Sequence, residues 1–189
     1  MTNTLCSTSC SSYSELPEPG LCLCTFKSGE TYVIEQGDNN HLVFLRSGSF
    51  IISSEERECY RVVASNVVFC SRSYLYTIVA EEDSQILVAR FVNGNITSEG
   101  DTYRSIATEV AKVNYRFTAV PINNVLGSVI DSIAFYLEQG ANSKAMHHAK
   151  IEEMFVVFRY FYPREVYLRM FYSLFNNNMS FRTLVINNA

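Results

Sequence analysis

The chain of 189 residues contains no tryptophan and only 3 histidines. Catalytic metal centres commonly use two or three imidazoles, so this scarcity disfavours a histidine-rich metal site. The chain also lacks a surplus of basic residues, with 15 Lys and Arg against 19 Asp and Glu. Neutralising phosphates needs such a surplus, so nucleic-acid binding by this chain alone is disfavoured. No apolar run approaches the roughly 18 residues of a membrane-spanning helix, and we expect no membrane partner.

Catalytic sequence motifs are absent as well. The chain holds no G-x-S-x-G elbow, no phosphate-binding G-x-x-x-x-G-K-[ST] loop, no G-x-G-x-x-G turn and no H-E-x-x-H helix. Four of the 6 cysteines lie near the start, but C-x3-C followed by C-x-C is not a zinc-binding spacing. We therefore predict that the protein is not an enzyme and has no catalytic residues, no metal ligands and no cofactor.

The residues that are present are typical of a globular domain. Hydrophobic residues make up 48% and charged residues 18% of the chain, which allows a sizeable core. The segment Met1–Cys10 has neither the charged start nor the apolar centre of a secretory signal. We therefore expect a cytoplasmic location.

The first half of the chain predicts short β-strands. Between Gly20 and Phe91, segments rich in β-branched and aromatic residues alternate with turn residues such as Ser47-Gly48. No helical pattern intervenes, which favours antiparallel pairs in a β-barrel or roll. The predicted strands are Leu21–Phe26, Thr31–Glu35, His41–Arg46, Ser49–Ser53, Tyr60–Val63, Asn66–Cys70, Tyr74–Val79 and Gln85–Phe91.

The pattern changes to helical spacing from Pro121 onward. One helix is predicted to end before Gly140, and a second to begin after Ser143 as its N-cap. Pro163 suits the first turn of a third helix, and a fourth, short helix is expected from Ser180. Residues 101–120 connect the two halves, and within them Ile106–Val113 could form either one helical turn or a strand over the barrel. The sequence thus predicts an α+β fold in which strands come first.

The adjacent pair His147-His148 lies early in the second predicted helix. Neighbouring helical residues point about 100° apart, so they cannot grip one metal ion as a pair one turn apart can. We interpret them as a solvated or interface pair.

Several segments, taken in order, resemble one family. The hairpin His41–Ser53 is similar to the strand–Ser-Gly–strand hairpin in the cupin-like sensory domain of AraC-type transcription regulators. The segments Phe117–Asn123, Tyr136–Gly140 and His148–Pro163 resemble AraC-type regulators of Bacteroidales-like bacteria. The closing Ser180–Asn188 resembles the junction into that family's DNA-binding domain. The resemblance covers about residues 20 to 189.

The resemblance implies a cupin-like antiparallel β-barrel or roll, followed by a helical subdomain of three to four helices. It implies an effector-sensing and dimerisation domain of an AraC-type regulator, whose C-terminal helix-turn-helix domain is absent from this chain. The expected partners are a second copy of the chain and a small-molecule effector of unknown identity, with DNA reached only through the missing domain. The expected divisions are an N-terminal arm (1–19), the barrel (20–100), a connector (101–120) and a helical dimerisation or linker subdomain (121–189).

The dimer contact is expected on the helices, because pairing of apolar helix faces about a two-fold axis would match two DNA half-sites. We assign it to Arg159, Tyr162, Arg169 and Phe171. The alternative is that the apolar members of these faces, Phe171 among them, are simply core. The effector-binding residues cannot be assigned, since both faces of the predicted strands are apolar.

Other classes of function remain open. A standalone cupin-type metalloenzyme, an isomerase or dioxygenase, would need a histidine cluster, whereas the barrel half offers only His41. A cyclic-nucleotide-type roll would need a phosphate-binding turn with a following arginine, which Gly29-Glu30 lacks. A small-molecule-binding module or a scaffold module are the remaining alternatives.

Overall fold

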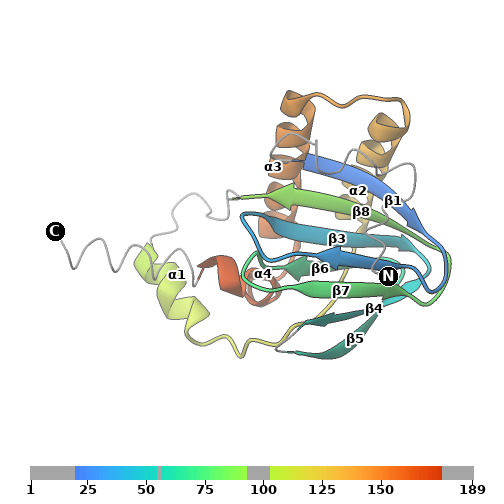
Figure 1. Cartoon of the computed structure of the whole chain (residues 1–189). Coiled ribbons are helices and arrows are strands. Elements are labelled where there is room, and N and C mark those ends of the chain that lie inside the picture. The colour runs from blue at the N-terminus through green and yellow to red at the C-terminus, as the bar shows by residue number, and fades with distance from the viewer. Residues whose placement is uncertain (1–19, 55–56, 93–102, 176–189) are drawn as a thin grey trace.

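The computed structural model describes residues 20–54, 57–92 and 103–175 of the chain. Within these ranges, two antiparallel sheets face each other, and helices cover the outer side of one of them (Figure 1). None of the helices in the described ranges has the length and apolarity needed to cross a bilayer.

The strands form two sheets whose neighbours are all antiparallel. The larger sheet has the order β1-β8-β3-β6-β9, and the smaller has the order β2-β7-β4-β5. The strands are β1 Gly20–Phe26, β2 Thr31–Ile34, β3 Asn40–Ser47, β4 Ser49–Ser54, β5 Arg57–Val63, β6 Asn66–Cys70, β7 Tyr76–Ala80, β8 Ser84–Phe91 and β9 Val120–Pro121. The eight strands predicted from the sequence are all present, within about three residues at each end.

The larger sheet is apolar on both faces because it separates two cores. In β3, Leu42 and Phe44 point toward the helices, whereas Val43 and Leu45 point into the space between the sheets. This period-two alternation follows from the pleat of a strand. The smaller sheet contributes only its inner face to the inter-sheet core, for example Ile52 of β4.

The labelled helices are α1 Tyr103–Val110, α2 Asn124–Glu138, α3 Lys144–Phe161 and α4 Arg164–Met170. Residues 172–175 are helical as well. The side chain of Asn123 caps α2 by accepting a hydrogen bond from the backbone N–H of Leu126 at 2.9 Å. The predicted cap Ser143 likewise accepts from the N–H of Met146 at 3.2 Å. After α2, Gly140 adopts a φ of +76°, as expected for a glycine that terminates a helix.

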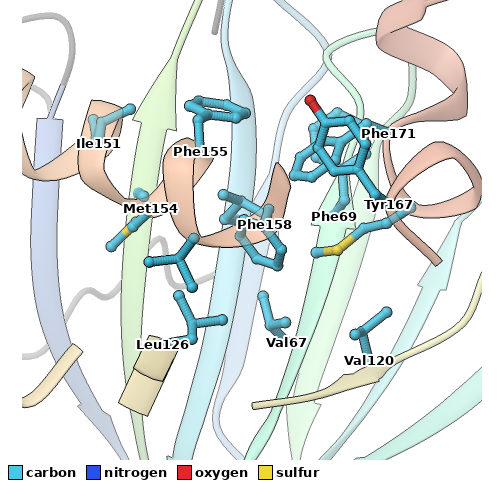
Figure 2. Close-up of a cluster of buried hydrophobic side chains, with 14 of the residues drawn as sticks. Val67, Phe69, Val120, Leu126, Ile151, Met154, Phe155, Phe158, Tyr167 and Phe171 are labelled. Carbon is cyan, nitrogen blue, oxygen red and sulfur yellow. The ribbon is translucent and has the colours of Figure 1, made fainter. Parts of the chain in front are cut away.

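Helix α3 is the main cover of the larger sheet (Figure 2). Its buried residues Phe155 and Phe158 contact Phe171, the residue at the end of α4, with ring centroids 5.5 and 5.2 Å apart. Phe171 in turn lies 5.3 Å from Phe69 of β6. Helix α2 adds Leu126, which is fully buried. This aromatic packing holds the helical part directly on the sheet.

The predicted α+β class, an antiparallel β-roll followed by helices, is confirmed. Of the two alternatives for Ile106–Val113, a helical turn or a strand, the structure has the helix, α1. A short strand that was not predicted, β9, follows it and pairs with β6 through Val120 and Val67. The predicted N-terminal arm and the helix expected from Ser180 lie outside the described residues, and the predicted division into domains stays a prediction.

Candidate functional site

The space between the sheets is apolar along its length and polar at one end. The N-terminal end of β3 and the C-terminal ends of β6 and β8 meet there. They bring His41, Cys70 and Arg90 into one row, since His41 is the register partner of both other residues. Directly paired residues in an antiparallel sheet point to the same face. Because Val43 and Val88 on that face belong to the inter-sheet core, the row points inward.

The facing sheet contributes Tyr76 and Ser54 at the same end. These two residues are partners between β7 and β4. The hydroxyl of Tyr76 accepts a hydrogen bond from the backbone N–H of Ser71 at 3.2 Å, which places it beside the end of β6. We call the five inward-facing residues His41, Ser54, Cys70, Tyr76 and Arg90 the polar end of the roll.

Nδ1 of His41 and Oγ of Ser54 are buried polar atoms at this end, and neither has a hydrogen-bond partner among the described residues. The His41 side chain is well buried, with only 6% of the residue exposed. A buried polar group without a partner costs about 1–3 kcal/mol, so each atom offers a place where a ligand atom would be stabilised.

The electrostatic setting of His41 favours the neutral imidazole. Burial, and after it the positive charge of Arg90, lower the pKa of His41 to about 4. At neutral pH the ring is therefore uncharged and offers one N–H donor and one nitrogen acceptor. Arg90 itself is half-buried, and its guanidinium is positively charged and offers only hydrogen-bond donors.

Aromatic rings lie next to the polar end on the side of the smaller sheet. The ring of Tyr76 lies 6.4 Å from that of Tyr74 and 6.2 Å from that of Phe117. Phe117 belongs to the connector and also contacts Tyr60 of β5, edge to face, at 5.8 Å. The connector thus places an aromatic side chain against the inter-sheet core, beside the polar groups.

This set of groups does not suit a metal ion. Within the described ranges, no group of three or more His, Cys, Asp or Glu residues is arranged to hold a metal. His41 is the one imidazole at this end, and the neighbouring guanidinium of Arg90 repels cations. A hydrogen-bonding ligand fits these residues better than a divalent metal does.

The four residues predicted for the dimer contact lie elsewhere, on α3, on α4 and at their ends. Phe171 is a core residue with 0% of its surface exposed, so it has no area to offer a partner. The Tyr162 hydroxyl donates to the carbonyl of Pro121 at 2.9 Å and accepts from the N–H of Asn123 at 3.0 Å, so it joins α3 to the start of α2. Burial raises the pKa of Tyr162, which keeps this hydroxyl protonated.

The two predicted interface arginines are half-buried on the helices. Arg159 lies with its guanidinium carbon 6.0 Å from the ring centroid of Tyr160. Arg169 pairs with Glu165, one turn earlier on α4. Their interface role, like that of Tyr162, stays a prediction.

The interpretation of His147-His148 as a solvated or interface pair is wrong for His147. Its side chain is fully buried, and Nδ1 accepts a hydrogen bond from the backbone N–H of Leu21 at 2.9 Å. Nε2 therefore carries the proton, which it donates to Oδ1 of Asn142 at 2.5 Å. His148 is exposed. Helical spacing could not reveal this, because the partner of His147 lies on a strand 126 residues earlier in the chain.

The polar end was not found from the sequence. The one available signal was that His41 and Arg90 interrupt otherwise apolar strands at the ends of those strands. A polar residue at a strand end is ordinarily solvated, so this signal becomes informative only when the pairing of the strands is known.

Comparisons with known proteins find partial structural similarity. No protein-family model matches the chain, and no curated protein matches it. A cupin superfamily protein from Desulfitobacterium hafniense is 16% identical, and the match covers 40% of this chain and 69% of that protein, with a TM-score of 0.37. A conserved protein of unknown function from Streptococcus pyogenes is 18% identical over 41% of this chain and 67% of that one, with a TM-score of 0.38.

The ectoine synthase from P. lautus is 14% identical, and the match covers 39% of this chain and 53% of the synthase, with a TM-score of 0.36. The chain thus matches about half the length of that enzyme. Similarity at these TM-scores assigns neither a family nor an activity.

Proposed function

We propose that this chain is the effector-sensing and dimerisation domain of an AraC-type transcription regulator, and that the polar end of the roll binds the effector. The order of the motifs, from the hairpin His41–Ser53 to the helix of His148–Pro163, supports the regulator role. DNA would be bound by a C-terminal domain that this chain does not include, and the regulator would act in the cytoplasm.

One observation carries the ligand-binding part of the proposal. Nδ1 of His41 and Oγ of Ser54 are buried at the same end of the inter-sheet core, with no partner among the described residues. A small molecule that hydrogen-bonds to both atoms would remove the cost of leaving them without a partner, and the neighbouring apolar side chains would cover the rest of the molecule. Ligand sites commonly combine a mainly apolar lining with a few polar groups in this way.

The donor set favours binding over catalysis. A metalloenzyme would need several ligands converging on a cation, whereas Arg90 places a positive charge beside His41. An acid–base enzyme would need a group that titrates near neutral pH, and the pKa of His41 is about 4. We therefore propose a non-enzymatic role, without a metal or cofactor.

The dimerisation part of the proposal is supported by exposed apolar side chains on the outer side of the helices. Tyr160 and Phe161 at the end of α3 are 62% and 54% exposed, and Val125 at the start of α2 is 39% exposed. These two helix ends adjoin, because the side-chain amide of Asn123 donates to the carbonyl of Phe161 at 3.0 Å. A second copy that covers these residues would bury apolar surface, which favours association.

Two measurements test the proposed function. A metabolite panel should contain a compound that raises the melting temperature of the chain, because a ligand that binds only the folded state stabilises it by mass action. The gene should continue beyond the codon for Ala189 into a basic segment with two helix-turn-helix patterns. A stop codon there would contradict the regulator role, and salt-sensitive DNA binding by this chain alone would contradict the assignment of DNA binding to a separate domain.

A further inference from the structure

We propose that the polar end of the roll binds a small carboxylic acid with an apolar body, with its carboxylate between Arg90, His41 and Ser54. This inference rests on the proposed ligand-binding function and names the class of ligand.

The first argument is the kind of hydrogen-bonding group that gathers there. Arg90 offers only donors, and the Ser54 hydroxyl can donate. Neutral His41 can place its proton on Nδ1, the buried atom that has no partner among the described residues. A carboxylate only accepts hydrogen bonds, and its two oxygens can accept from several donors at once. A neutral polyol would also need acceptors, which this row supplies poorly.

The second argument is charge. Arg90 is the register partner of His41 on the same inward face, and the repulsion by Arg90 contributes to the low pKa of His41. The positive field of the guanidinium therefore reaches the buried atom that needs a partner. An anion placed between the two residues would be attracted by Arg90 and would accept from His41, and charge-assisted hydrogen bonds of this kind are the stronger ones.

The third argument is the surroundings of the polar groups. Tyr74, Tyr76 and Phe117 form a chain of ring contacts next to the row. The remaining inter-sheet core is mainly aliphatic and aromatic, with Cys22 and Cys24 on β1. An apolar or aromatic body attached to the carboxylate would lie against these side chains and lose its contact with water. A small inorganic anion would gain nothing from this lining.

The test compares benzoate with benzamide, which has the same ring but no charge, by calorimetric titration and by the ring signals of the three histidines in NMR. Benzoate should bind and shift the His41 signals, while the signals of exposed His148 stay in place. In Arg90→Gln, the affinity for benzoate should fall roughly tenfold or more, as expected for loss of a hydrogen bond to a charged group. Arg90→Lys, which keeps the charge, should retain more of the affinity than Arg90→Gln.

The matched control is Arg61→Gln, because Arg61 lies on the smaller sheet, pairs with Glu81 at 2.6 Å and is largely exposed. It should leave the benzoate affinity unchanged. Since Arg90→Gln could lower stability, Ser54→Ala provides a second variant, which should weaken benzoate binding several-fold. Equal binding of benzoate and benzamide would overturn the carboxylate assignment while supporting ligand binding at this end. Absence of benzoate binding would overturn the inference alone, because the metabolite panel tests the proposed function separately.

Discussion

Gly48 carries the turn between β3 and β4, with a φ of +82°, a conformation that side chains rarely adopt. A Cβ atom added there would lie 2.2 Å from Oγ of Ser84 and 2.6 Å from the carbonyl oxygen of Asp83. The turn between β1 and β2 contains Gly29, which has a similar φ of +84° but open space around it. The two glycines therefore separate the cost of the backbone conformation from the cost of the collision.

We expect Gly48→Ala to lower the free energy of unfolding by about 2–4 kcal/mol, because it combines an unfavourable φ with a clash against backbone. Gly29→Ala should cost about 1 kcal/mol, since only the φ is unfavourable. Urea denaturation of both variants measures the difference. Equal losses in the free energy of unfolding would show that the atoms around Gly48 move to accommodate the added Cβ at no extra cost.

His41 should make the stability of the fold depend on pH. Burial, then the charge of Arg90, lower its pKa from 6.5 to about 4 in the folded chain. Above pH 6.5 the imidazole is neutral in both the folded and the unfolded state. Between 6.5 and about 4, the unfolded chain takes up a proton that the folded chain does not. The free energy of unfolding should therefore fall with decreasing pH, by up to about 3 kcal/mol across this window.

Urea denaturation at several pH values checks this expectation in the native chain and in His41→Gln, which cannot titrate there. The variant should lose less stability between neutral and acidic pH than the native chain. His148→Gln, which changes an exposed histidine, should keep the native pH dependence. If the free energy of unfolding of His41→Gln depends on pH as it does in the native chain, then His41 is not the group that titrates.

Among the elements, α3 is attached to the edge of the larger sheet by His147 as well as by apolar packing. The imidazole accepts from the backbone of β1 through Nδ1 and donates to Asn142 through Nε2. Because β1 is an edge strand, the N–H of Leu21 needs a partner from outside the sheet. His147 supplies that partner from the first turns of the helix.

We expect His147→Ala to destabilise the chain by about 2–4 kcal/mol, because it leaves a cavity and a buried N–H without a partner. His148→Ala, at the next position of the same helix, should change stability by less than about 0.5 kcal/mol, since the side chain is exposed. Thermal or urea denaturation compares the two variants. Similar losses in both would contradict the attachment of α3 to β1 through His147.

For the molecule as a whole, the proposed dimer has a specific surface. The chain has a mass of 21.5 kDa, and light scattering should give about twice this mass. Phe161→Asp should shift the mass toward the monomer, because it places a charge on an exposed apolar position at the end of α3. Arg159→Glu and Arg169→Glu should also shift the mass toward the monomer, because each reverses the charge of a residue assigned to the dimer contact.

The control for this experiment is Phe135→Asp, on the later part of α2, where the side chain is 57% exposed. It introduces the same charge on a comparably exposed ring and should leave the mass unchanged. A monomer in the native chain would contradict the dimer. A native dimer that persists in all three interface variants would exclude these helix ends as the contact.

The alternation of strands and turns, and later the helical spacing, were sufficient to predict the order of elements. Segments such as Leu42–Leu45 are short, entirely apolar and close to turn residues such as Ser47-Gly48, a pattern that favours a buried strand. Ser143 and Gly140 marked helix ends because their local chemistry acts within a few residues. The positions of strands and helix ends depend mainly on residues that are neighbours along the chain, and the sequence shows which residues these are.

The polar end of the roll depends on contacts between distant segments. His41, Cys70 and Arg90 meet only because β3 pairs with both β6 and β8, and the two faces of these strands are equally apolar in the sequence. His147 was misjudged for the same reason, since its partner is on β1. The strands, the helices and the helix ends could thus be predicted from the order of amino acids. Which polar groups are buried together was decided by the pairing of strands that are far apart in the sequence.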